Sequence, residues 1–245
     1  MTRARDTAYS HDANGTLASA TDQSGTTNFA YDFEDRLIEA GNATYSYDAF
    51  GRKVTAQTGA TTTDYLFDGA EVVRETAATG NIDYTRGLEN RLVSREAGSS
   101  TAYYHHDSIG SVVALSGGAG ALMDSYSYYA FGNVLEQTGT SEQPYLYLGN
   151  AYDEQTSLYD FHARHYGAEA GRFVTKDPVS GIAPLPQTLN PYPYGLNNPH
   201  AMPDPDGELP NPIQNWIMDP QANVEGTIRT FDTPGSPSRI PACRR

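Results

Sequence analysis

The chain is poor in the residues that build disulfide frameworks, membrane spans and nucleic-acid surfaces. It has one cysteine, Cys243, in 245 residues, which excludes a disulfide framework and a zinc site made of cysteines. No apolar run approaches the roughly 20 residues of a membrane-spanning helix, and residues 1–8 lack the apolar stretch of a signal peptide. With 16 basic against 30 acidic residues, the net charge of −14 has the wrong sign for nucleic-acid binding.

Large aliphatic side chains are also scarce, which argues against a helical protein. Only 38% of the residues are hydrophobic, whereas the chain contains 18 tyrosines, 23 glycines and 15 prolines. This composition favours short strands and turns over packed helices. A core would then be built from tyrosine rings, which bury a large apolar area and keep a hydroxyl group for hydrogen bonding.

One tyrosine- and aspartate-containing motif recurs along the chain. Its aspartates, at positions 12, 32, 48 and 68, are 16 to 20 residues apart. The copies are residues 9–17, 31–37, 45–54 and 65–69, with weaker ones at 103–111, 126–133 and 145–149. A repeat of this length predicts stacked supersecondary units, each packed against its neighbours.

Each copy of the motif is typical of a β-hairpin. In the third copy, Tyr45 and Tyr47 alternate with Ser46, so both rings face one side of a strand. Asp48 then begins a turn, in which its carboxylate can accept hydrogen bonds from N–H groups two residues on. Gly51 supplies the positive φ that other residues resist. The sequence therefore predicts a structural role for the repeated aspartate.

The motif at residues 45–52, Tyr-x-Tyr-Asp-x-x-Gly-Arg, resembles the YD repeat of Rhs proteins, insecticidal toxin-complex C subunits and teneurins. In that family the repeats spiral into a hollow β-shell around a C-terminal toxin. The resemblance implies a mainly β fold, in which stacked antiparallel hairpins form part of a shell wall and end in a strand- and turn-rich plug with little helix.

A second resemblance covers five blocks that occur in the order of the Rhs repeat-associated core. They are residues 104–112, 152–166, 171–178, 190–199 and 204–207. The resemblance predicts three parts: a hairpin array at 1–102, the core at 103–207, and a variable tail at 208–245. The tail is rich in proline and too short for a core of its own, which indicates a truncated cargo region.

In many relatives the core ends in a self-cleavage site with the pattern Pro-x-x-x-x-Asp-Pro-x-Gly-Leu. Four residues stand at matching positions: Pro199, Asp204, Pro205 and Gly207. The pattern breaks at Glu208, which replaces the leucine, and Leu209 follows one residue late. The resemblance places a cut near Gly207, Glu208 and Leu209, and the departure falls on the residue that flanks it.

An aspartic-protease-like site needs two carboxyl groups, because one holds a proton while the other accepts one. The candidates are Asp177 and Asp206, with Asp204 as a substitute, and Arg172 could hold a carboxylate in its charged form. The alternative is that the Asp-Pro pairs at 177–178 and 204–205 are simple turns of a strand-rich plug. Both interpretations remain open from the sequence.

No cofactor or metal site is predicted. His105 and His106 would point to opposite faces of a strand and could not grip one ion. His162 and His165 would share a face only on a helix. The sequence has no P-loop, no dinucleotide fingerprint and no nucleophile elbow.

The function that the sequence predicts is structural: the C-terminal fragment of an Rhs-type polymorphic toxin or cell-surface protein, forming shell wall and plug. The expected partners are upstream shell-forming repeats and a C-terminal cargo, and the expected location is outside the cell or on its surface, as part of a larger exported protein. Two alternatives are a single-turnover self-cleaving core and a repeat module that binds cell-surface glycans through tyrosines.

Overall fold

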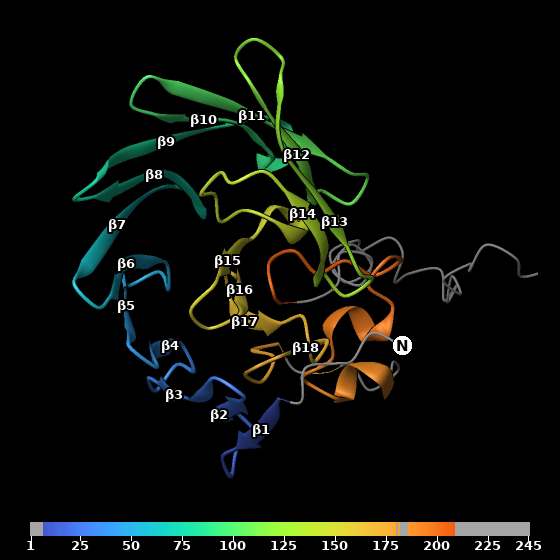
Figure 1. Cartoon of the computed structure of the whole chain (residues 1–245). Coiled ribbons are helices and arrows are strands. Elements are labelled where there is room, and N and C mark those ends of the chain that lie inside the picture. The colour runs from blue at the N-terminus through green and yellow to red at the C-terminus, as the bar shows by residue number, and fades with distance from the viewer. Residues whose placement is uncertain (1–6, 180, 182–185, 209–245) are drawn as a thin grey trace, which may run out of the picture. The chain divides into compact units, whose positions relative to one another are not determined.

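The residues of the repeat form one antiparallel sheet, the wall, in which each strand pairs with its neighbours in the sequence. The computed structural model describes residues 7–179, 181 and 186–208. In this part of the chain the wall has 14 strands in sequential order, which confirms the predicted β fold of stacked hairpins with little helix (Figure 1). The strands are Ala8–His11 (β1), Leu17–Asp22 (β2), Gly25–Tyr31 (β3), Leu37–Ala40 (β4), Ala43–Tyr47 (β5), Lys53–Thr58 (β6), Thr61–Asp68 (β7), Glu71–Ala77 (β8), Gly80–Arg86 (β9), Leu92–Ala97 (β10), Ser100–His106 (β11), Val112–Gly117 (β12), Leu122–Tyr128 (β13) and Val134–Thr138 (β14).

A second, four-stranded sheet lies in the plug, the name used here for the described residues from Tyr145 to Glu208. Its strands are Ala151–Asp153 (β15), Leu158–Phe161 (β16), Arg164–Gly167 (β17) and Arg172–Phe173 (β18). Short 3₁₀ turns supply the remaining regular structure of the described residues: Leu88–Asn90 (η1), Tyr147–Gly149 (η2), Pro186–Leu189 (η3) and Tyr194–Asn197 (η4). No helix among these residues has the length and apolar composition that crossing a membrane requires.

In four of the described wall turns, an aspartate of the repeat closes the turn by accepting two backbone hydrogen bonds. After β5, Oδ1 of Asp48 accepts from the N–H groups of Phe50 (2.9 Å) and Arg52 (3.0 Å). Gly51 lies between them at φ 80°, a left-handed conformation that glycine adopts without strain. The predicted structural role of the aspartate is therefore confirmed in this turn. The same two bonds are made by Asp12, Asp32 and Asp107.

Arginines that follow the aspartate tie neighbouring turns together. Nε of Arg52 donates to Oδ2 of Asp48 at 2.7 Å, and its Nη1 reaches the carbonyl of Gly69 in the next turn at 2.9 Å. Arg36 pairs with Asp32 in the same way and extends to the carbonyl of Asp48. Each ion pair therefore also sets the spacing between successive turns.

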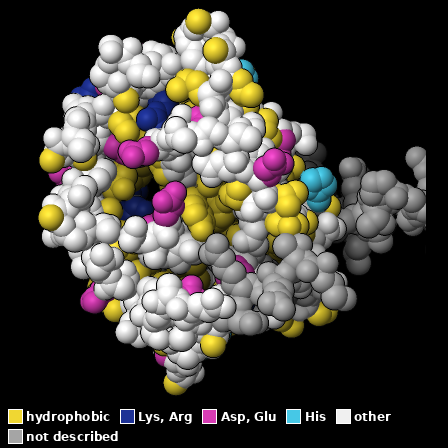
Figure 2. Space-filling view, in the orientation of Figure 1, with side chains coloured by type: hydrophobic (Ala, Val, Ile, Leu, Met, Phe, Trp, Pro, Cys, Tyr) yellow, Lys and Arg dark blue, Asp and Glu magenta, His cyan; other side chains and the backbone are white. Residues whose placement is uncertain are grey.

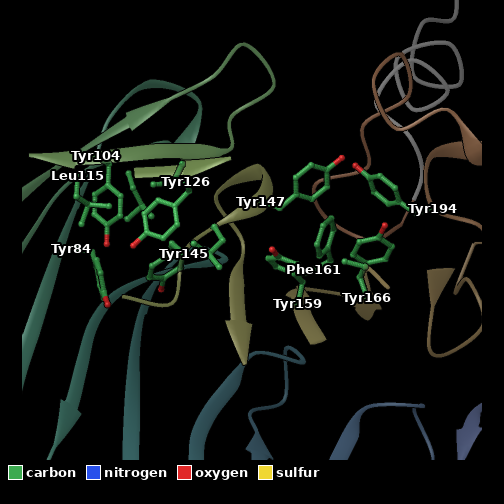
Figure 3. Packing of buried hydrophobic residues seen from close by; sticks show 14 of the residues in the cluster. Tyr84, Tyr104, Leu115, Tyr126, Tyr145, Tyr147, Tyr159, Phe161, Tyr166 and Tyr194 are labelled. Atoms are coloured by element: carbon green, nitrogen blue, oxygen red, sulfur yellow. The ribbon is translucent and has the colours of Figure 1, made fainter. Parts of the chain in front are cut away.

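Aromatic rings form the core where the wall packs against the plug. Wall tyrosines such as Tyr84, Tyr104 and Tyr126 are buried on its inner face. Figure 3 shows them on one side of Tyr145, with the plug rings gathered on the other side. The plug rings are at most 2% exposed and meet at edge-on or tilted angles that suit aromatic pairs. They are Tyr147, Tyr159, Phe161, Tyr166, Phe173 and Tyr194.

Polar contacts join the wall to the plug around which it curves (Figure 1). Nζ of Lys53 on β6 lies 2.7 Å from Oδ2 of Asp160 on β16, with both side chains mostly buried. Burial alone would raise the pKa of Asp160, but the Lys53 charge holds it well below its ordinary range. Tyr45 on β5 donates to Asp153 at 2.5 Å, and the N–H of Leu17 donates to the carbonyl of Val174 at 2.9 Å.

The predicted boundaries between the parts of the chain can be compared with the strands of the structure. The expected boundary between residues 102 and 103 lies within β11, and the wall continues through it to β14. The described residues of wall and plug belong to one compact unit. Of the predicted tail, residues 209–245 lie outside the described part of the chain, as does the candidate Leu209.

Candidate functional site

The segment from Asp204 to Glu208 is held by hydrogen bonds to four consecutive carbonyl groups. The Pro205 carbonyl accepts from Nδ2 of Asn150 (3.1 Å), and the Asp206 carbonyl from the N–H of Ala163 (3.1 Å). The next two carbonyls, of Gly207 and Glu208, accept from the guanidinium of Arg164. A segment anchored at every residue is a fixed part of the plug.

Gly207 allows this segment to pass close to the β16–β17 hairpin. Its φ is 71°, and a Cβ atom at this position would lie 2.6 Å from the carbonyl oxygen of Phe161. Both the conformation and the approach exclude a larger side chain. The glycine of the Asp-Pro-x-Gly pattern is therefore required by packing.

Arg164 is the centre of the site. It is 3% exposed, and its guanidinium carbon lies 3.6 Å from the ring centroid of Phe173. Its Nη2 lies 3.0 Å from Oδ2 of Asp177, 3.4 Å from Oδ2 of Asp204 and 3.3 Å from the carbonyl oxygen of Glu208. One buried nitrogen thus brings two carboxyl groups and one peptide carbonyl together.

Burial makes the carboxyl groups of this site hold protons more tightly than usual. Burial, followed by the nearby charges of Asp206 and Asp177, raises the pKa of Asp204 to about 8, although Arg164 opposes the change. Burial also raises the pKa of Asp177, while Arg164 again favours the charged form. At neutral pH, Asp204 is therefore mostly the neutral acid. Asp177 is in closer contact with Arg164, which favours the charged form of this carboxyl group over that of Asp204.

The structure brings together three of the four residues that the sequence singled out. Asp177 and Asp204 share Arg164, and Asp206 lies near enough for its charge to act on Asp204. Arg172 has a different contact: its guanidinium lies over the ring of Tyr192, 4.8 Å from the centroid. The arginine that holds the carboxylates is Arg164.

Sequence reasoning missed Arg164, although a signal for it was present. On the strand β17, Arg164 and Tyr166 are two residues apart and so face the same side. Tyr166 belongs to the buried face, which places an arginine there as well. A buried arginine requires carboxylate partners, and this requirement would have pointed to the site.

His105 and His106 make hydrogen bonds within the wall. Nε2 of His105 lies 2.8 Å from Oγ of Ser116, whereas His106 bonds the carbonyls of Gly110 and Leu92. Among the described residues, no group of three or more His, Cys, Asp or Glu side chains is arranged to hold a metal ion. For the glycan alternative, the tyrosines most open to solvent in the same part of the chain are Tyr9, Tyr103 and Tyr129, at 39–43% exposure.

The raised pKa of Asp204 predicts how stability depends on pH. In the folded chain Asp204 keeps its proton up to about pH 8, whereas in the unfolded chain it loses it near pH 4. The free energy of unfolding should therefore fall as pH rises through this window, by about 1.4 kcal/mol per unit from this group. Asp204→Asn should remove that slope. Urea unfolding at several pH values tests this, and an unchanged slope in the variant would contradict it.

Comparison with known proteins agrees with this architecture. The family model for the teneurin YD-shell matches residues 76–200. The tRNA3(Ser)-specific nuclease WapA of Bacillus spizizenii is 33% identical over 221 residues, which cover 84% of this chain and 9% of the nuclease. Toxin protein Tse5 of Pseudomonas aeruginosa is 34% identical over 106 residues, 43% of this chain and 8% of the toxin. The chain thus spans less than a tenth of the length of these relatives.

Solved structures share the fold. The crystal structure of TcdB2-TccC3 without its hypervariable C-terminal region superposes with a TM-score of 0.60 at 16% identity. The matched part covers 82% of this chain and 13% of that structure. At this identity the likeness concerns the fold alone. The family model covers about half of the sequence, including the last wall strands and most of the plug. The chain therefore belongs to the teneurin YD-shell family.

Proposed function

We propose that this chain is the wall and plug of a larger shell that encloses a C-terminal cargo and is exported with it. The observation that carries this proposal is the hollow between wall and plug. It has a volume of about 1670 Å³ and is lined by strands β5 to β10 on one side and by the plug on the other. Figure 2 shows it open on the face drawn, with hydrophobic side chains inside and charged ones at its margin.

The lining of the hollow suits a polypeptide. Aromatic rings such as Tyr65, Tyr126 and Tyr145 offer apolar surface, and ten acidic side chains outnumber five basic ones. An unfolded segment with a positive net charge would find both apolar and electrostatic partners on such a surface. Toxin relatives such as Tse5 support the view that the enclosed cargo is a toxin.

Limited proteolysis tests this proposal, carried out on the longest polypeptide that the gene encodes. Lys53→Met leaves the mostly buried Asp160 without its cation, which costs roughly 3–5 kcal/mol and weakens the joint between wall and plug. Residues 209–245 should then be digested faster than in the wild type. Arg74→Met is the matched control, since it breaks the exposed cross-strand pair with Asp83. Equal digestion of all three proteins would contradict enclosure.

Self-cleavage is a second candidate function, favoured by the contacts of Arg164. Nη2 of Arg164 contacts the carbonyl of Glu208 as well as Asp177 and Asp204, so this carbonyl is the one near both acids. Arg164 would stabilise the negative charge that develops on this carbonyl oxygen. Glu208 departs from the family's leucine, but its contribution to the site is the main-chain carbonyl.

The two acids can divide the chemistry of hydrolysis. The Asp177 carboxylate takes a proton from water as the water oxygen adds to the carbonyl carbon of Glu208. Neutral Asp204 donates a proton to the carbonyl oxygen. As the C–N bond breaks, Asp177 gives the proton it took from water to the leaving nitrogen, and the hydroxyl group formed from the carbonyl oxygen returns its proton to Asp204. One water is consumed, which leaves a carboxylate on Glu208 and a free amine on Leu209.

Intact mass spectrometry tests self-cleavage. The purified chain should convert from one species of 26.6 kDa into two that meet between residues 208 and 209. Asp177→Asn and Asp204→Asn should each stop the conversion, because each removes one of the two proton-transfer groups. The exposed Asp68→Asn is the control and should cleave like the wild type. A wild-type chain that stays at 26.6 kDa from about pH 5 to pH 8 would rule out this function.

A further inference from the structure

Asn150 connects the acid site to a turn of the wall. It is 6% exposed and follows η2 directly. Its N–H donates to the carbonyl of Tyr147 at 3.1 Å, and its own carbonyl accepts from the N–H of Leu146 at 3.0 Å. The backbone on both sides of the Asn150 side chain is therefore fixed by hydrogen bonds.

The loop that carries Asn150 is attached to the wall through the turn of Asp107. Oγ of Ser111, which is fully buried, accepts from the N–H of Leu148 at 3.2 Å. The N–H of Val112, at the start of β12, donates to the carbonyl of Leu146 at 2.9 Å. Ser111 is itself held by Asp107, whose Oδ1 accepts a hydrogen bond from the Ser111 N–H at 2.8 Å. The position of Asn150 thus depends on an intact wall turn.

At its other end, Asn150 holds the residue next to Asp204. Its Nδ2 donates to the carbonyl of Pro205 at 3.1 Å. Proline has no N–H, so this carbonyl is the one main-chain group through which Pro205 can be hydrogen-bonded. The N–H of Asp204 makes a long contact, 3.5 Å, with the hydroxyl of Tyr194. Loss of the Asn150 contact would therefore loosen the acid that gives the proton.

We propose that Asn150 is a positioning residue of the acid site, through which the wall turn at residues 107–111 holds Asp204 beside Asp177 and Arg164. The proposal rests on the self-cleavage proposed above. Under this proposal, cleavage requires a folded wall, because the plug reaches its reactive geometry only after the wall turn at residues 107–111 has formed. A shell that is not yet folded would then keep its cargo attached.

Asn150→Ala tests this role against a matched control, Asn133→Ala. Asn133 also joins a wall turn to a plug carbonyl, since its Nδ2 donates to the Ala168 carbonyl at 2.8 Å.

Two quantities are measured in the full chain. The pKa of Asp204 comes from a carbon NMR titration of labelled aspartates, and the rate of cleavage comes from intact mass. Asn150→Ala should move the Asp204 pKa from about 8 toward its ordinary value. It should also slow cleavage by about tenfold or more, because small displacements in an active site are costly. Asn133→Ala should change neither.

The outcomes separate this role from the proposed function. If the wild type does not cleave but only Asn150→Ala shifts the Asp204 titration, the positioning role stands and self-cleavage fails. The positioning role is overturned if Asp204 titrates in Asn150→Ala as it does in the wild type. It is also overturned if Asn150→Ala cleaves at the wild-type rate. Equal shifts in both variants also overturn it, since they would show a general loosening of the plug.

Discussion

The architecture depends on a carboxylate that closes a five-residue turn. Each time Asp48 or one of its counterparts accepts the two N–H groups ahead of it, the chain reverses over a fixed number of residues. The following strand then starts in one register, and the alternation of side chains is preserved from hairpin to hairpin. Tyrosines that occupy equivalent positions in the repeat therefore reach the same face of the wall. A drift of one residue in any turn would send the rings to solvent.

The plug explains why rings on one face are stable in a chain with few aliphatic side chains. Tyr159, Phe161 and Tyr166 pack at tilted and edge-on angles, and two of their hydroxyl groups reach carbonyls of the wall turn at Phe131 and Gly132. Each tyrosine ring so bonded removes apolar surface from water without leaving its hydroxyl unpaired. The plug therefore stabilises the curvature of the wall, and another of its rings, Phe173, packs against Arg164.

The sequence predicted the parts of the molecule that are local. The repeat, its hairpins, the role of Asp48 and the β-rich plug all depend on residues within one turn or strand of each other. The acids Asp177 and Asp204 were found through family resemblance, but whether they meet depends on packing across the 26 positions between them.

The choice of arginine shows why local patterns were insufficient. Arg172 stands in the same sequence block as Asp177, but it begins β18 and lies over the ring of Tyr192. Arg164 reaches both acids because β17 turns it toward the buried rings, and its partners are 13 and 40 residues away. Likewise, the link from Asn150 to Pro205 joins a loop to a segment 55 residues later. Such contacts follow from the fold as a whole.

Native-state hydrogen exchange tests the central claim most directly, namely that wall and plug stabilise each other as one cooperative unit. If they do, the amides of β5 and β6 in the wall and of β16 in the plug will exchange with the same free energy of opening as denaturant is added. The contrary result would be wall amides that open at a much lower free energy while those of β16 stay protected. The plug would then fold without the wall, and the route proposed here from wall turn to acid site would not exist.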